Sequence, residues 1–175
     1  MIDEAKPSVR ETRLMRSRFE SGNRISGWVY GTIVVMGAVV VGSAGSADPW
    51  RVATAVAGTV LVLWIAHVYA RAIGESIFAG RRLDRRELTE VAGEELTIPL
   101  AAVPPIGALV LGAAGVLRES RAIWAALAIG LLTLAAAGLR YARVEHLNRL
   151  ATAVSVALNL ALGLVIVALE VALSH

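Results

Sequence analysis

The stretch ISGWVYGTIVVMGAVVVGSA, residues 25–44, contains no charged side chain. An α-helix rises about 1.5 Å per residue and the hydrocarbon core of a bilayer is about 30 Å thick, so a helix of this length crosses the core once. Four more uncharged runs of similar length follow, at residues 52–70, 96–117, 122–139 and 150–169. A soluble domain of 175 residues could not surround five such helices with polar surface. The sequence therefore predicts an all-α integral membrane protein with five transmembrane helices.

The basic residues between these runs predict an orientation. Of the 17 Lys and Arg residues, only Arg51, Arg118 and Arg121 lie in the connections after the first and third runs. The others lie in the N-terminal arm, in residues 71–95 and in the turn after the fourth run. Short basic segments stay in the cytoplasm, so we expect a cytoplasmic N-terminus and a C-terminus outside. A chain so rich in Ala, Val, Leu and Arg is typical of multi-pass proteins in the inner membrane of high-GC bacteria, which is the expected location.

The domain organisation follows from the same pattern. Residues 1–24 form a cytoplasmic basic arm, and residues 25–175 form a single membrane domain with a charged helical insert at residues 71–95. Within the insert, we expect the second transmembrane helix to continue past the membrane and to end at Gly80. A second helix then runs from about Asp84, a good N-terminal cap, to about Gly93. The lipid bilayer, and anionic lipids at the basic cytoplasmic face, are the expected partners, and nucleic acid is not.

Glutamates of the insert form one candidate site. Glu87, Glu90 and Glu94 have the spacing i, i+3 and i+7, which places them on one helix face. Carboxylates gathered in this way bind divalent cations. The alternative is ordinary surface charge, because Arg85 and Arg86 are close enough in sequence to pair with them.

Small residues form a stripe on the first transmembrane helix. Its members are Gly27, Gly31, Ala38 and Gly42. Small side chains allow the backbones of membrane helices to approach closely, which favours their association. The stripe predicts helix packing, either within the subunit or between the two copies of a homodimer that associate through the first transmembrane helix.

The third run contains prolines in its first half, among them Pro104 and Pro105. A proline inside a helix removes a backbone hydrogen bond and bends the helix, and the carbonyl that loses its donor then needs another partner. Broken helices of this kind line the substrate sites of many transporters. A structural kink without a transport role is the alternative.

Polar residues inside the other runs are further candidates for a transport path. His67 lies about one turn from the inner end of the second run, where it can carry a proton, ligate a metal or bond a neighbouring helix. Asn159 lies near the middle of the fifth run, where an amide needs a polar partner or water. Glu170 follows at the outer end, where it either continues this polar stripe or lies in the interface.

Several local sequences resemble the vacuolar iron transporter family. They are NRISGWVYGTIVVMG at residues 23–37, AHVYA at residues 66–70 and AAVPPI at residues 101–106, and the resemblance extends over about residues 23–173. It implies a five-span dimer that exports ferrous iron from the cytosol in exchange for protons, with an acidic metal-binding insert. The resemblance also implies an acidic residue in each of the first two spans. Tyr30 and Val68 occupy those two positions here, and His67 is adjacent to the second.

Two functional hypotheses follow from these features. The first is a transporter of divalent metal cations, with or without coupling to protons. Its expected path includes Tyr30, His67, Pro104, Pro105, Asn159 and Glu170, and a metal ion is its cargo rather than a bound cofactor. The second is a non-transporting scaffold or accessory protein, which packs through its Gly and Ala stripes and binds lipid or a partner at its basic inner face. The sequence has no cysteine and no recognisable catalytic constellation, so an enzyme is not expected.

Overall fold

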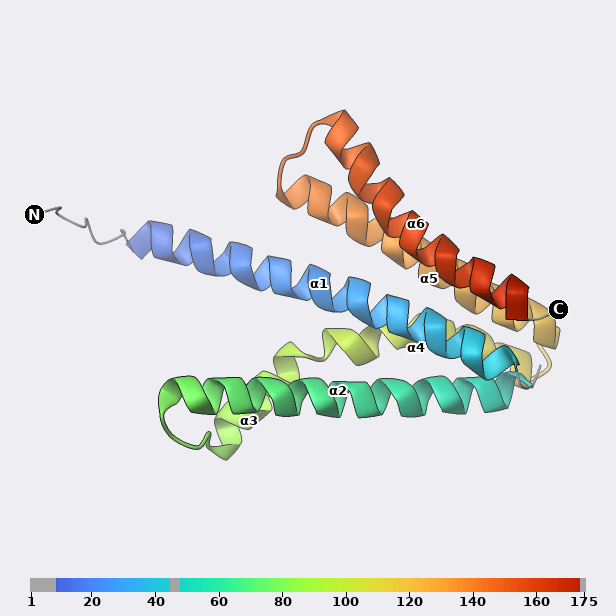
Figure 1. The fold of residues 1–175 in the computed structure, drawn as a ribbon, viewed down its shortest axis with the longest axis horizontal. Helices are drawn as coiled ribbons and strands as arrows, with labels where there is room; N and C mark the ends of the chain where they lie inside the picture. Colours follow the sequence, from blue (N-terminus) through green and yellow to red (C-terminus); the bar gives the residue numbers. More distant parts are fainter. Residues whose placement is uncertain (1–8, 45–47, 174–175) are drawn as a thin grey trace, which may run out of the picture.

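The computed structural model describes residues 9–44 and 48–173, and the side chains of residues 25–44 and 48–172. The described residues form six helices and no strand. The helices are α1 (Val9–Ala44), α2 (Pro49–Ala79), α3 (Arg85–Glu94), α4 (Thr97–Ala113), α5 (Glu119–Val144) and α6 (Arg149–Leu173). Figure 1 shows α1, α2, α5 and α6 as long rods in an elongated bundle, with the short α3 beside one end of α2.

Four of these helices are long and apolar enough to cross a membrane, namely the part of α1 from Ile25, α2, α5 and α6. The third predicted span is different, because α4 has 17 residues and satisfies the same criterion only together with α3, across a bend of 47°. The described chain thus contains four or five potential spans. Numerous large apolar side chains are exposed on the bundle surface, which is expected for a protein that faces lipid.

The basic arm and the first predicted span form one continuous helix. α1 has 36 residues, which corresponds to about 54 Å, much more than a bilayer core requires. In Figure 1 its N-terminal end extends beyond α5 and α6, at the same end of the molecule as the turn between α2 and α3. Residues 1–8 of the predicted arm lie outside the described residues.

Helix caps define the ends of α2 and the start of α3. Asp48 caps α2, since its side chain accepts a hydrogen bond of 3.0 Å from the backbone N–H of Trp50. At the other end, Gly80 adopts a left-handed conformation with φ 64°, which a glycine accepts without strain. Asp84 caps α3, as predicted. The break at Gly80 and the second helix of the insert are therefore confirmed.

The core lies around α1, which packs against α2, α4, α5 and α6. Its fully buried side chains are almost all aliphatic and include Val35, Met36, Val39, Ile98, Leu109, Leu127 and Leu134. Thr32 is also buried, and its hydroxyl donates to the backbone carbonyl of Trp28 at 2.7 Å. Beside the middle of α1, the bundle is thus a tightly filled apolar core.

The predicted glycine stripe of α1 is used for packing within the chain. Gly27 lies against Thr97 of α4 and Gly31 lies against Ile98 and Ala101 of the same helix. Gly42 lies beside Val52 of α2, and Ala38 packs against the core. Of the two alternatives left by the sequence, packing within the subunit is the one observed. A homodimer through α1 stays a prediction.

The predicted break in the third span lies at a different place from the prolines. Pro104 and Pro105 are inside α4, which continues through both of them from Thr97 to Ala113. The 47° bend lies between α3 and α4, around Glu95 and Leu96. The helix is therefore not broken at the two prolines, and a kink there stays a prediction. The chain instead changes direction where the charged insert meets the apolar run.

Candidate functional site

Two of the predicted path residues, Tyr30 and His67, meet on neighbouring helices. The rings of Tyr30 on α1 and His67 on α2 have centroids 5.1 Å apart and are inclined by 45°. Such a tilted arrangement is favourable for aromatic rings. His67 is half-buried and Tyr30 is exposed over 41% of its surface, so the contact lies at the edge of the bundle.

One nitrogen of His67 is committed to the backbone. Its Nδ1 lies 3.2 Å from the carbonyl oxygen of Leu63, one turn earlier in α2. If Nδ1 carries the proton and donates to this carbonyl, Nε2 is an acceptor or a metal ligand. Within the described side chains, Nε2 has no hydrogen-bond partner. This nitrogen is therefore available to take up a proton or an ion.

An ionic cluster lies one helical turn beyond His67. The guanidinium group of Arg71 donates to Glu95 at 2.8 Å, to Glu94 at 2.8 Å and to Glu75 at 3.1 Å. Glu95 is only 8% exposed, so its carboxylate depends on this partner for compensation of its charge. Arg71 thus connects α2 to the end of α3 and to the residue at the bend before α4. We call Arg71, Glu75, Glu94 and Glu95 the Arg71 cluster.

A second contact shows how far α3 folds back along α2. The indole N–H of Trp64 donates to the backbone carbonyl of Ala92 at 3.3 Å. Trp64 lies inside the second apolar run, so the last turn of α3 lies beside the inner third of that run. Glu75 and Glu94 remain largely exposed to solvent, whereas the more buried Glu95 depends on its pairing with Arg71.

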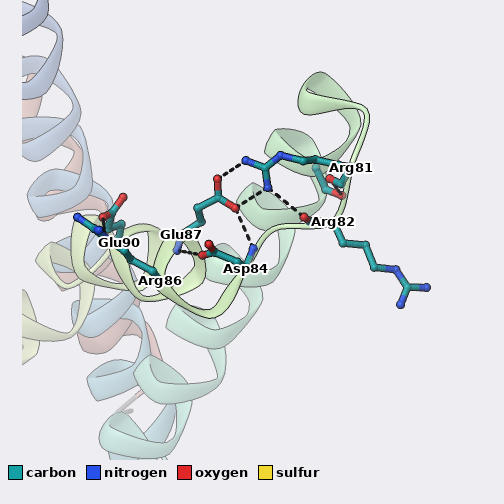
Figure 2. Close-up of polar contacts among 7 residues, drawn as sticks. Arg81, Arg82, Asp84, Arg86, Glu87 and Glu90 are labelled. Carbon is teal, nitrogen blue, oxygen red and sulfur yellow. Dashed lines mark hydrogen bonds and ion pairs between the residues drawn. The ribbon is translucent and has the colours of Figure 1, made fainter.

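The start of α3 carries a separate ionic network (Figure 2). Arg81 binds both oxygens of Glu87, at 2.6 and 2.9 Å. Glu87 also accepts a hydrogen bond of 2.8 Å from the backbone N–H of Asp84, whose side chain in turn accepts from the N–H of Glu87 at 2.8 Å. The two residues form a capping box, which satisfies donors at the N-terminus of α3.

The three glutamates of the predicted metal site have three different partners. Glu87 is bound to Arg81, Glu94 belongs to the Arg71 cluster, and Glu90 lies 3.2 Å from Arg86 in an exposed ion pair. Within residues 25–44 and 48–172, no three His, Asp or Glu side chains are arranged to hold a metal ion. The glutamates share a helix face but are not a ligand set, because each points toward a different arginine. The structure shows the alternative, which is ion pairing. Arg86 pairs as expected, whereas Arg81 and Arg71 take the place of Arg85.

A prediction about pH follows from the bidentate contact of Glu87. The hydrogen bonds from Arg81, and then that from the backbone of Asp84, lower the pKa of Glu87 from its ordinary value of 4.5 to about 2. A depressed carboxyl pKa stabilises the folded state above pH 4.5, and this contribution disappears as the pH falls from 4.5 to 2. A carboxyl-carbon NMR titration of Glu87 should thus have a midpoint near 2. In Arg81→Gln the midpoint should move up toward the ordinary value, and an unchanged midpoint would contradict the assignment.

A buried carboxyl group lies at the opposite end of α1. Glu170 of α6 is 6% exposed, and its two oxygens lie 3.0 and 2.9 Å from the hydroxyl oxygen of Ser43. The same hydroxyl is 2.8 Å from the carbonyl of Val39, but it has one proton to donate. If Glu170 carries a proton, it donates to Ser43 while Ser43 donates to Val39, and every group is satisfied. Glu170 is therefore packed inside the bundle, where it connects α6 to the end of α1.

The other predicted path residues have structural partners. The amide of Asn159 donates to the carbonyl of Ser155 at 2.9 Å, and it also lies against Gly138 of α5. The Ser155 hydroxyl is 3.4 Å from the Gly138 carbonyl, so this pair holds α5 close to α6. Pro104 is exposed and Pro105 is buried in the core. Asn159 thus bonds within α6 and packs against α5, and Pro105 is part of the core.

The sequence alone did not predict which side chains these candidate residues contact. It did not predict that Ser43 binds Glu170, or that Arg71 connects Glu94 and Glu95. A usable signal was present for the pair of Ser43 and Glu170, since both residues lie at the outer ends of predicted spans.

Comparison of the chain with protein-family models, curated proteins and solved structures found no match. The resemblance to the vacuolar iron transporters therefore stays a prediction from short sequence motifs.

Proposed function

We propose that this chain is a five-span protein of the bacterial inner membrane that transports a cation, with its N-terminus in the cytoplasm. The transported or exchanged species is a proton or a divalent metal ion. The contact of Tyr30 with His67 carries this proposal, because two residues selected independently in the sequence meet on different helices. The alternation of basic segments supports the orientation.

Two protonatable positions lie beside different parts of α1, one next to Tyr30 and one next to Ser43. The inner one is His67, whose Nε2 is available beside Tyr30. The outer one is Glu170, which binds Ser43. Tyr30 and Ser43 are separated by about 20 Å along the helix. Between these positions the side chains of the core are aliphatic, so transport requires that α1 moves relative to its neighbours, as in alternating access.

The proposal includes a relationship to the vacuolar iron transporters and a homodimer. The packing of α1 restricts which of its faces could form the dimer. The glycine stripe of α1 already contacts α4 and α2 of the same chain. A dimer through α1 would have to use another face of the helix, on which Tyr30 and Val41 are exposed. Such a dimer would place the Tyr30–His67 pair near the subunit interface.

A flux assay tests the transport function. The protein is reconstituted in liposomes, and uptake of Fe²⁺, Mn²⁺, Zn²⁺ and Co²⁺ is measured with an internal metal-sensitive dye and across an imposed pH gradient. Loss of an ion ligand or a proton carrier reduces activity by about 10- to 100-fold in comparable sites. We therefore expect such a reduction in His67→Ala and in Glu170→Gln.

Matched variants serve as controls for this assay. His146→Asn removes a histidine from the turn after α5, where φ is 51° and asparagine is tolerated. Glu119→Gln removes an exposed carboxylate at the start of α5. Both controls should retain flux. If neither His67→Ala nor Glu170→Gln lowers the flux, the proposed roles of these residues are wrong.

The second candidate is the non-transporting scaffold, which the close helix contacts favour. Gly31 against Ile98 and Gly138 against Val156 bring helices within the range of backbone contact, and Gly130 makes room for the side chain of Met36. The Arg71 cluster holds α3 in place as a cytoplasmic element to which a partner can bind. No flux of protons or of any tested ion, with correctly folded protein, would favour this function.

A further inference from the structure

We propose that the groove between α1 and α5 at their inner ends is a binding site for one anionic phospholipid. The groove is a cavity of about 170 Å³ lined by Ile25, Trp28, Thr133, Ala136, Ala137 and Arg140. α1 and α5 contact each other along the bundle, so both walls belong to the packed part of the chain. The inference rests on the membrane placement in the proposed function, but not on transport.

The lining of the groove separates into a polar end and an apolar end. Arg140 follows the uncharged fourth run directly and is exposed, so it lies at the level of the headgroups. Thr133 lies two turns deeper, or about 10 Å. Its hydroxyl donates to the carbonyl of Ile129 at 2.8 Å and is therefore already satisfied. The deeper part of the groove is thus effectively apolar, as an acyl chain requires.

The polar end contains two donors without protein acceptors. Among the described side chains, no carboxylate pairs with Arg140, and no acceptor binds the indole N–H of Trp28. A guanidinium group binds a phosphate through charge-assisted hydrogen bonds, and tryptophan side chains favour the headgroup region of a membrane. A phosphate between Trp28 and Arg140 would satisfy both donors.

The shape of the groove favours a lipid over a soluble ligand. Pockets for drug-sized molecules typically have volumes of about 300–1,000 Å³ and enclose most of the ligand. This groove is smaller, and its lining between α1 and α5 is mostly apolar. A segment of an acyl chain suits such a lining, and the attached headgroup would place its negative charge beside Arg140.

Native mass spectrometry of the full chain in detergent tests this site. The protein is incubated with equal amounts of phosphatidylglycerol and phosphatidylcholine, and the lipid that stays bound is identified. We expect one molecule of phosphatidylglycerol to be retained preferentially. Arg140→Gln should weaken its binding by about fivefold, which is the effect of one arginine at an anionic lipid surface.

Two further variants separate the headgroup contact from the groove. Arg143→Gln removes an exposed arginine one turn later on α5, outside the groove, and should bind phosphatidylglycerol within about twofold of the unchanged protein. Ala136→Phe fills the channel and should reduce the binding of both lipids. Circular dichroism confirms that each variant is folded.

The outcomes are distinct. Equal losses in Arg140→Gln and Arg143→Gln would mean that the basic face attracts lipid without a site, and would overturn the inference. Retention of neither lipid by the unchanged protein would overturn it too. Preferential retention of phosphatidylglycerol in a protein that transports no ion would leave the lipid site standing and remove only the transport function.

Discussion

Replacing Gly31 by leucine is expected to destabilise the folded protein by about 3 kcal/mol, near the upper end of the usual cost of overpacking. A Cβ atom at this position would lie 3.0 Å from the carbonyl oxygen and 3.1 Å from the Cα of Ile98. Both are backbone atoms of α4, so they cannot move aside by a side-chain rotation. A larger side chain must therefore push α1 and α4 apart.

The expected result is measured as the thermal or denaturant midpoint of the detergent-solubilised protein. Gly37→Leu is the matched control, because it lies on the same helix and a Cβ there meets no atom within 4 Å. This control should keep its stability within about 0.5 kcal/mol or gain some, since glycine is unfavourable inside a helix. Equal losses in the two variants would show that α1 and α4 do not approach each other closely at Gly31.

Loss of Arg71 is expected to have the second-largest effect. Arg71→Gln leaves Glu94 and Glu95 without their cation, and Glu95 is buried. Breaking a fully buried ion pair typically costs about 3–5 kcal/mol, but Arg71 retains some contact with solvent. We therefore expect the free energy of unfolding to fall by about 2 kcal/mol, after a reduction for solvent screening.

Two comparisons isolate this effect. Arg86→Gln breaks the exposed pair with Glu90 and should change stability by less than about 0.5 kcal/mol. In the double variant Arg71→Gln and Glu95→Gln, the neutral amide removes the uncompensated charge, so part of the stability should return. Full stability in Arg71→Gln alone would contradict the role of the Arg71 cluster.

The distance between α2 and α3 provides an independent test of the Arg71 cluster. The chain has no cysteine, so spin labels at Thr59→Cys on α2 and Thr89→Cys on α3 report the distance between the helices without background labelling. Both positions are exposed. With Arg71 present we expect one narrow distance distribution. Arg71→Gln should broaden it, because the C-terminal end of α3 then loses its ion pairs with α2, while the Trp64 contact and the Arg81–Glu87 pair remain.

The sequence by itself determined the helices and their approximate ends. Long uncharged runs, the glycine at Gly80 and the cap at Asp84 act through local free energies: transfer into an apolar medium, backbone conformation and hydrogen bonds within one turn. Each of these free energies depends on residues that are close in sequence. They can therefore be predicted without knowledge of the tertiary structure. The charge pattern also depends on sequence alone, and it supports an orientation that stays a prediction.

Only the tertiary structure decided which side chains meet. Three contacts depend on how segments that are distant in sequence or separated by a turn come together. They are the approach of Tyr30 to His67, the burial of Glu170 beside Ser43 and the pairing of Glu87 and Glu94 with Arg81 and Arg71. Spacing along one helix placed the three glutamates on one face, but it carried no information about the arginines on α2 and on the turn before α3. The bend before α4 has the same origin, since it lies where the insert folds back on α2 and not where the prolines weaken the helix.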